Sequence, residues 1–220
     1  MESDASSASA PLLEAGLPRG KARSAGILLH GRDRTREEKV VLASSFQLDG
    51  IRWLAPAADT GSWYPGRFFD PLEVNEPYLS QAIEQIDQVV DNAGEDGRLA
   101  ARHIFLVGFS QGACLALEYA LRRPGRCGAL VVFTGGIFGP PDQPRKFAPG
   151  LLTGLRVFLT GSDADDWIPE ASTRQTADTL TSLGAEVTLH IYPGRPHIVS
   201  PEELAEAREF ILVHHPSERD

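Results

Sequence analysis

The chain has 220 residues, a formal net charge of −9 and 42% hydrophobic residues. This length and composition predict one globular domain with a core of ordinary size. The acidic balance disfavours nucleic acid and anionic membranes as partners, because both require a basic patch. No apolar stretch approaches the ~20 residues of a membrane-spanning helix, and the N-terminus lacks the basic start and apolar core of a signal peptide. The sequence therefore favours a soluble protein with no membrane span.

The chain has two cysteines. Cys114 and Cys127 have no metal-ligand spacing and are interpreted as reduced, packed thiols, which fit the reducing cytoplasm. We expect neither a metal nor another cofactor.

Gly and Pro divide the chain into short segments. Residues 1–23, rich in Ser and Ala, have no sustained periodicity and are interpreted as a mostly disordered tail. Residues 24–215 are expected to form a single α/β domain, in which a mostly parallel sheet carries helices on both faces. The expected strands lie near 25–30, 51–55, 102–108, 128–133, 155–160 and 186–191, and the expected helices near 35–46, 76–93, 111–122, 170–183 and 201–214.

Two stretches interrupt this alternation. Residues 57–75 are rich in aromatics, and residues 135–150 are rich in Gly and Pro. Long loops without secondary structure are usually functional or disordered.

The most informative stretch is Gly108-Phe109-Ser110-Gln111-Gly112, which lies between an expected strand and an expected helix. The pattern G-x-S-x-G in this context is typical of a nucleophile elbow, a tight turn that exposes the serine at the end of a sheet. The two glycines let the strand and the helix approach each other closely. The alternative is that Ser110 only caps the following helix.

A nucleophilic serine needs a base and a carboxylate that orients the base. His197 follows an expected strand, as do three candidate acids, Asp163, Asp165 and Asp166. Parallel sheets place their sites at the carboxyl ends of strands, and the order Ser, Asp, His is the one expected for such an elbow. His197 is alternatively an ordinary loop histidine. The residues by themselves leave the choice among the three acids open.

An oxyanion hole would complete the site, because acyl transfer develops negative charge on the carbonyl oxygen. The strand that ends at His30-Gly31 predicts that the backbone N–H of Arg32 is one donor, and the residue after the nucleophile, Gln111, supplies the other. In both cases the backbone amide carries the role, so the identity of the side chain says little about it. His30 is expected to brace the loop by hydrogen bonds and not to act as a second base.

With these elements placed, the chain resembles the phospholipase/carboxylesterase family, which includes the acyl-protein thioesterases. The resemblance covers roughly residues 24–213. It depends on five motifs in the right order: Leu29-His30-Gly31-Arg32, Trp63-Tyr64-Pro65, Gly108-Phe109-Ser110-Gln111-Gly112, Asp163-Ala164-Asp165-Asp166-Trp167-Ile168-Pro169 and Gly194-Arg195-Pro196-His197.

The resemblance implies an α/β-hydrolase fold and selects Asp165 as the triad acid, by the family pattern D-x-D-x-x-[VI]-P. Two departures stand out: Asp33 replaces a frequent glycine in the oxyanion loop, and Asp166 replaces a frequent proline. Few residues precede the strand that ends in His-Gly. We therefore expect a trimmed N-terminal edge, with at most one short strand near residues 11–13.

The expected activity is hydrolysis of carboxylic esters or thioesters through an acyl-serine, with Ser110, Asp165 and His197 as the catalytic residues. A small-molecule ester or thioester is the expected partner. The alternatives are a lysophospholipase or acyl-protein thioesterase acting on longer chains, a peptidase or lipase, and a catalytically silent binding module. The sequence leaves a homodimer open.

The acyl group is expected to be short to medium in length, because the roughly twenty residues between the strands near 128–133 and 155–160 offer no amphipathic helix for a lid domain. The alternative for each candidate wall residue is that it packs beneath its own loop. The expected wall consists of Trp63, Tyr64, Phe68, Phe69, Ile137, Phe138, Trp167 and Ile168.

Overall fold

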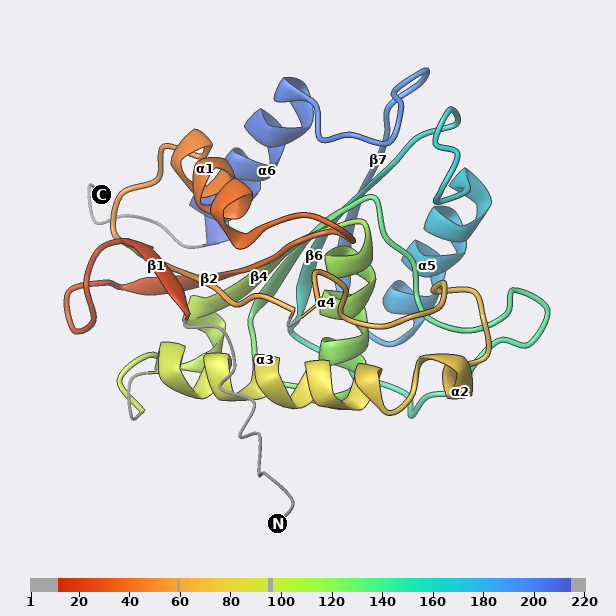
Figure 1. The fold of residues 1–220 in the computed structure, drawn as a ribbon, viewed down its shortest axis with the longest axis horizontal. Coiled ribbons are helices and arrows are strands. Elements are labelled where there is room, and N and C mark those ends of the chain that lie inside the picture. The colour runs from red at the N-terminus through yellow and green to blue at the C-terminus, as the bar shows by residue number, and fades with distance from the viewer. Residues whose placement is uncertain (1–11, 59, 95–96, 215–220) are drawn as a thin grey trace, which may run out of the picture.

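A seven-stranded sheet with the order β1-β3-β2-β4-β5-β6-β7 forms the centre of the molecule (Figure 1). The computed structural model describes residues 12–58, 60–94 and 97–214. Strand β1 runs antiparallel to β3, and all other neighbouring strands are parallel. The strands are β1 (Leu13–Gly16), β2 (Ser24–Leu29), β3 (Ile51–Ala55), β4 (Ile104–Phe109), β5 (Ala129–Phe133), β6 (Arg156–Gly161) and β7 (Glu186–Ile191).

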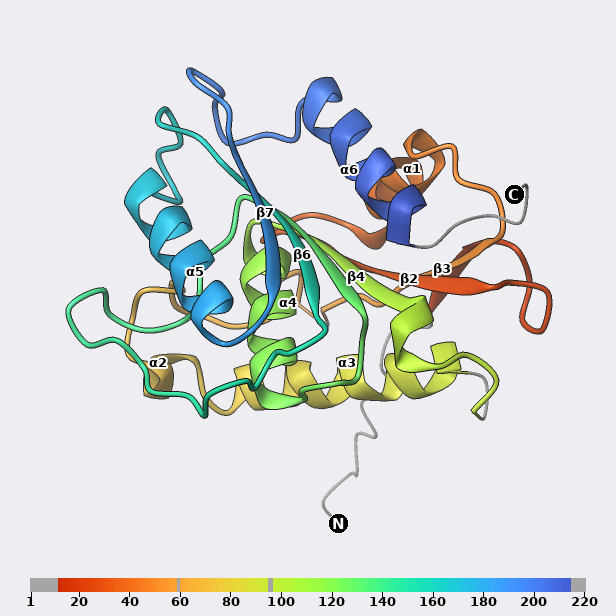
Figure 2. The same cartoon turned by 180° about the vertical axis from the view of Figure 1, so that it is seen from behind.

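Helices cover both faces of the sheet, as the two opposite views show (Figures 1 and 2). One face is covered by α1 and α6, and the other by α3, α4 and α5. Alternate strand residues face opposite sides, so Leu28 packs in the core beneath α1 and α6, whereas Ile27 and Leu29 pack in the other core. The helices are α1 (Arg36–Ser45), α2 (Leu72–Asn75), α3 (Tyr78–Gly94), the short η1 (Ala101–His103), α4 (Gln111–Arg122), α5 (Glu170–Ser182) and α6 (Pro201–His214).

The predicted α/β-hydrolase architecture is confirmed. Every strand and helix expected after residue 24 is present, with its ends shifted by no more than two residues. The N-terminal edge is trimmed as predicted, since β1 is the one strand that the described residues place before β2. Residues 134–155 contain no helix, so no lid domain covers the sheet. Within residues 12–58, 60–94 and 97–214, no helix has both the length and the apolar composition needed to cross a bilayer.

The expected tail is too long at its C-terminal end. Residues 12–23 are described and contain β1, whose Glu14 carboxylate accepts hydrogen bonds of 2.9 and 3.0 Å from the Arg52 guanidinium on β3. Leu13 and Ala15 pack against the core beneath α1. The one short strand expected near residues 11–13 is therefore present, shifted to Leu13–Gly16 and held by its pairing with β3. The rest of the expected tail, residues 1–11, lies outside the described residues.

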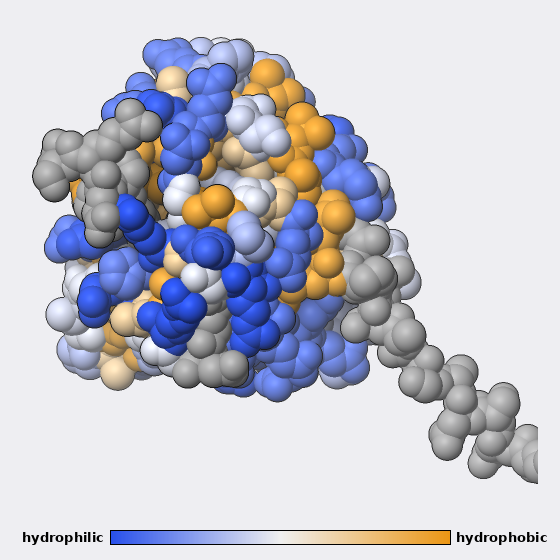
Figure 3. Space-filling view, turned by 90° about the vertical axis from the view of Figure 1, so that its left-hand side faces the viewer, coloured by the Kyte–Doolittle hydropathy of each residue, from blue (hydrophilic) through white to orange (hydrophobic). Residues whose placement is uncertain are grey.

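Some apolar side chains lie on the outside. Figure 3 shows a strip of hydrophobic side chains, bordered by hydrophilic ones, on the face at the β1 end of the sheet. Exposed large apolar residues of the described chain include Val41 on α1 and Val213 near the end of α6. About half of an ordinary protein surface is apolar, so these residues do not by themselves indicate a partner.

Gly26 lets two aromatic rings close over the middle of the sheet. It stands in β2 directly opposite Trp53 of β3 on one side and Phe105 of β4 on the other. The two rings meet edge to face, with centroids 5.4 Å apart. A Cβ atom at Gly26 would lie 2.4 Å from the Trp53 ring and 2.9 Å from the Phe105 ring. Both rings are buried and have little room to move.

Gly26→Ala should therefore lower the free energy of unfolding by about 1–3 kcal/mol, because overpacking forces side chains away from their rotamers. Gly94→Ala, at the end of α3, is the matched control. Among the described residues, only Leu99 O would lie within 4 Å of its new methyl group, at 3.7 Å, so the variant should be neutral or stabilising by up to ~1 kcal/mol. Urea denaturation measures both. Equal stabilities for the two variants would contradict this account of the aromatic packing.

Candidate active site

Ser110 occupies the turn between β4 and α4 in a strained backbone conformation, with φ 54° and ψ −116°. Its N–H donates a hydrogen bond of 3.0 Å to the carbonyl of Phe133 at the end of β5. A Cβ at Gly108 would lie 2.4 Å from the Gly112 carbonyl oxygen, and a Cβ at Gly112 would lie 2.3 Å from the Leu29 carbonyl oxygen. Only glycine fits at both positions, and this tight crossing is what the elbow pattern predicts.

The hydroxyl of Ser110 does not cap α4, because it makes no hydrogen bond to the first turn of the helix. Instead Oγ lies 2.9 Å from Nε2 of His197. The N-cap alternative considered from the sequence therefore does not describe this side chain.

His197 connects Ser110 to Asp165. Its Nδ1 lies 2.8 Å from Asp165 Oδ2 and 3.0 Å from Oδ1. Because a carboxylate only accepts, these partners assign the proton to Nδ1 and leave Nε2 free to accept from the Ser110 hydroxyl. The three side chains, from the ends of β4, β6 and β7, thus form one continuous hydrogen-bonded chain.

Asp165 is held as an anion. Burial by itself raises the pKa of this carboxyl, but the hydrogen bond with His197 and those from the backbone N–H groups of Ile168 and Trp167 outweigh it, so its pKa lies below the ordinary value. The two backbone bonds, 2.9 and 2.8 Å long, both end on Oδ1. The carboxylate is therefore both charged and fixed in direction.

Among the described residues, His197 forms its hydrogen bonds and ion pair with Asp165 and not with the other two acids of the loop. Asp163 Oδ1 accepts a hydrogen bond of 2.7 Å from the Gly194 backbone N–H, so it joins the acid loop to the histidine loop. Asp166 is exposed. Of the three acids that the sequence left open, Asp165 is the one whose geometry matches the choice implied by the family pattern.

The two predicted oxyanion donors lie on the loops that flank Ser110. Gln111 is the first residue of α4, where backbone N–H groups have no acceptor inside the helix and the helix dipole is positive. Arg32 follows β2, and next to it Asp33 adopts φ 57° while its N–H bonds to the Gly61 carbonyl. Asp33 thus takes a left-handed conformation that glycine adopts freely and that Asp tolerates better than most residues.

The side chains of these two residues do more than the sequence indicated. The Gln111 amide accepts from the Trp63 N–H at 3.0 Å and donates to Ser62 Oγ and the Tyr64 carbonyl. The Arg32 guanidinium donates to the carbonyls of Tyr64, Pro65 and Gly66. Together they hold residues 62–66 against the nucleophile turn. The sequence shows the motifs at Arg32 and at Trp63-Tyr64-Pro65 but does not indicate that they are in contact.

His30 braces the same region, as predicted. It is 1% exposed, its Nδ1 lies 2.8 Å from the Gly31 carbonyl, and its Nε2 accepts from the Ala58 N–H at 3.0 Å. The Trp63 indole N–H donates to the His30 carbonyl at 2.9 Å. Both ring nitrogens are thus used in holding backbone.

The eight residues expected to form the wall of the acyl site differ in their solvent exposure. Trp167 is 65% exposed, with its ring centroid 6.2 Å from that of His197. Phe69 and Ile137 are partly buried. The buried members are Trp63, Tyr64, Phe68, Phe138 and Ile168, which fits the alternative that they pack beneath their own loops.

Phe68, Ile137 and Phe138 also line a cavity of about 50 Å³ between α5 and the Gly/Pro-rich loop. Ser110 is not among the residues that line it.

The cysteines are buried and free. Burial raises the pKa of Cys114 to about 11 and that of Cys127 to about 12, so neither is a ready nucleophile. Among the described residues, no group of three or more His, Cys, Asp or Glu side chains has an arrangement that could hold a metal ion.

The comparisons with known proteins agree with this geometry. The model of the family described as phospholipase/carboxylesterase matches residues 17–215. The chain is 24% identical to lysophospholipase-like protein 1 of Mus musculus, over 92% of each chain. It is 27% identical to acyl-protein thioesterase 1 of Debaryomyces hansenii, over 72% of this chain and 71% of the other.

Solved structures give the same answer. The crystal structure of a phospholipase/carboxylesterase from Dyadobacter fermentans superposes with a TM-score of 0.83, at 32% identity, and covers 91% of this chain and 95% of that one. The structure of esterase PE8 has a TM-score of 0.75 at 25% identity and covers 92% and 97%. The family model, which spans most of the sequence, and the aligned fold lead to one conclusion: the chain belongs to the phospholipase/carboxylesterase family and is a hydrolase of the carboxylesterase type.

Proposed function

We propose that the enzyme hydrolyses carboxylic esters or thioesters with short to medium acyl chains, through an acyl intermediate on Ser110. The observation that carries the proposal is the continuous hydrogen-bonded chain from Ser110 through His197 to Asp165, which starts at a strained elbow. Neither step of the proposed reaction requires a cofactor.

In the first step Ser110 Oγ attacks the acyl carbon, and its proton passes to His197 Nε2. Asp165 accepts from Nδ1 and stabilises the imidazolium that forms. The backbone N–H groups of Gln111 and Arg32 are the proposed donors to the oxyanion. The tetrahedral intermediate collapses as His197 gives its proton to the leaving alcohol or thiol.

The second step repeats this chemistry with water. His197 takes a proton from the attacking water, and the acyl–Oγ bond breaks as the proton returns to Ser110. The products are a carboxylic acid and the free enzyme.

The proposed acyl site is open and shaped by loops. Trp167 and Ile198, which are 65% and 48% exposed, stand on the loops that carry Asp165 and His197. Residues 134–155 form no helical cover over the sheet. These features favour soluble substrates over long lipid chains.

The proposal places the enzyme in the cytoplasm, because two reduced thiols suit a reducing compartment. A homodimer stays possible, and sedimentation would detect it.

Replacing Ser110 with Ala should lower turnover of an activated ester by at least about 10⁴-fold while the fold is retained. Circular dichroism checks the fold, and release of p-nitrophenol measures activity. A fluorophosphonate probe should label the wild-type protein stoichiometrically and leave Ser110→Ala unlabelled. A folded wild-type protein that neither reacts with the probe nor turns over ester would instead be a silent binding module.

The three acids give a sharper test. Asp165→Asn should reduce kcat by about 10³- to 10⁴-fold, because an amide no longer favours the imidazole tautomer that the reaction needs. Asp163→Asn and Asp166→Asn are matched controls on the same loop. Asp163→Asn keeps an acceptor for the Gly194 N–H, and Asp166 is exposed, so both should remain close to wild type. An active Asp165→Asn beside an inactive Asp163→Asn would overturn the assignment.

Acyl specificity tests the description of the open site. With p-nitrophenyl esters of increasing chain length, kcat/KM should rise and then fall within short lengths, since each buried CH₂ gains up to ~0.8 kcal/mol until the wall is reached. No jump in rate should accompany micelle formation. Marked interfacial activation, or a preference for long-chain lysophospholipids or acylated peptides, would favour the longer-chain alternatives suggested by the names of the relatives.

A further inference from the structure

We propose that Arg195 is a positioning residue for His197, acting through a buried ion pair with Glu203; this role is additional to the proposed function and assumes that His197 is its base. Arg195 lies two residues before His197 and is 6% exposed. The proposed mechanism gives it no part in bond making. Its burial in the loop that carries the base therefore needs another explanation.

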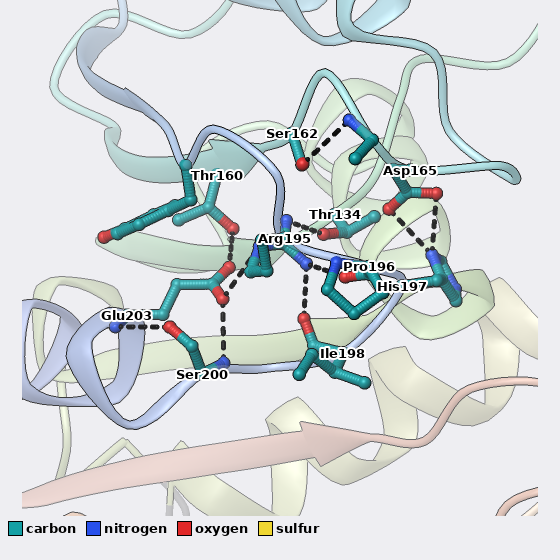
Figure 4. A network of polar contacts seen from close by, with 12 residues as sticks. Thr134, Thr160, Ser162, Asp165, Arg195, Pro196, His197, Ile198, Ser200 and Glu203 are labelled. Atoms are coloured by element: carbon teal, nitrogen blue, oxygen red, sulfur yellow. Dashed lines mark hydrogen bonds and ion pairs between the residues drawn. The ribbon is translucent and has the colours of Figure 1, made fainter.

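The guanidinium of Arg195 forms hydrogen bonds with the backbone on both sides of His197. Nη1 donates to the carbonyl of Pro196 at 2.9 Å and to the carbonyl of Ile198 (Figure 4). The Ile198 N–H in turn donates to the Pro196 carbonyl at 2.7 Å, so His197 lies at the centre of a tight turn. One cation thereby binds both flanking carbonyls of the residue whose imidazole must stay aligned.

The same guanidinium is fixed to the strand ends that carry the rest of the site. Nη2 donates to Thr134 Oγ1 at 2.7 Å. Thr134 is fully buried and adopts φ 56°, a rare conformation for a β-branched residue. The residue before it, Phe133, accepts the Ser110 N–H. Arg195 thus links the histidine loop to the backbone that also holds the nucleophile.

Glu203 supplies the balancing charge. Its Oε2 lies 3.3 Å from Arg195 Nε and accepts from the Ser200 N–H at 3.0 Å, while Oε1 accepts from the Thr160 hydroxyl on β6. Ser200 Oγ accepts from the Glu203 N–H at 3.1 Å, which completes a capping box at the start of α6. Glu203 is fully buried, so its charge is tolerated only with these partners.

Arg195 makes more hydrogen bonds than the neutralisation of Glu203 requires. A single ion pair would neutralise Glu203, yet the guanidinium also donates hydrogen bonds to the two carbonyls around His197 and to Thr134. Lysine cannot reproduce this pattern, because its ammonium is a point charge without a planar fork. Positional precision matters here, since a displacement of about 1 Å can cost 10²-fold in rate.

The test compares Arg195→Lys with Arg52→Lys. Arg52 is also a buried arginine, 2% exposed, and binds a glutamate and a backbone carbonyl, but at the β1 end of the sheet. We expect both variants to lose thermal stability. Arg195→Lys should also lose about 10- to 100-fold in kcat with little change in KM, whereas Arg52→Lys should keep the wild-type kcat. Assays run well below both Tm values.

Two further variants keep the proposal testable if Arg195→Lys does not fold. Thr134→Val keeps the β-branched shape and removes only the acceptor for Nη2, so a smaller loss of kcat is expected. The double variant Arg195→Met with Glu203→Gln removes both charges and should fold, but remain as slow as Arg195→Lys. Wild-type kcat in Arg195→Lys or in the double variant, with only Tm reduced, would overturn the proposal.

A readout without turnover separates this proposal from the proposed function. The downfield proton resonance of His197 Nδ1–H reports its hydrogen bond to Asp165 in the free protein. It should persist in Arg52→Lys and weaken or disappear in Arg195→Lys. A wild-type protein that shows the resonance but hydrolyses no ester would contradict the proposed function alone, whereas an unchanged resonance in Arg195→Lys would contradict the positioning role.

Discussion

The backbone of Ser110 is the constraint around which the site is arranged. A non-glycine residue at φ 54° and ψ −116° costs on the order of 1–3 kcal/mol and persists only where its surroundings over-determine it. Here the Ser110 N–H is bonded to β5, and the crossing at Gly108 and Gly112 leaves no room for another path. The same turn ends at Gln111, where α4 begins, so the geometry that strains the chain also places the proposed nucleophile beside the proposed oxyanion donor.

The sheet brings the remaining groups to this turn. Parallel strands end at one edge, and the loops after β2, β4, β5, β6 and β7 all meet there. Hydrogen bonds between loops then set the distances: Asp163 binds the Gly194 N–H, and Gln111 holds the Trp63 loop. The Trp63 N–H is buried and would be costly to leave unpaired, whereas the bond from the Gly194 N–H to Asp163 is exposed. The loops of the site are therefore held together by side chains of one loop that form hydrogen bonds with backbone groups of another.

Much of this could be predicted from the sequence because it depends on local pattern. Strand and helix alternation, the glycines at 108 and 112, and the polar ends of strands are features of neighbouring residues. The choice of Asp165 needed the family pattern, because Asp163 and Asp166 have the same chemistry and nearly the same place in the chain. The sheet then separates them: Asp165 points at His197 and Asp163 at the Gly194 N–H.

What could not be predicted depends on contacts between distant positions. The Gln111 amide reaches residues 47 to 49 positions away, and β1 depends on an arginine 38 positions from Glu14. The roles of Trp63 and Tyr64 were ambiguous for the same reason. An aromatic residue in a long loop has the same sequence signature whether it faces substrate or packs inward. Which of the two occurs depends on the residues that the loop contacts in the folded protein.

The Gly/Pro-rich loop forms no lid but is tied to the helix that follows the nucleophile turn. Arg145 in this loop donates to the fully buried Glu118 on α4 at 2.5 and 3.1 Å, and Arg122 donates to the same carboxylate at 2.6 Å. Glu118 lies two turns along the helix that begins at Gln111, so the loop that carries Ile137 and Phe138 is tied to the helix of the nucleophile turn. A buried carboxylate shared by two arginines is costly to leave unpaired. These contacts fix the loop to α4. The proposed acyl specificity would then depend on side chains that are held in place, such as Ile137, and a change in substrate range would require changes in those side chains.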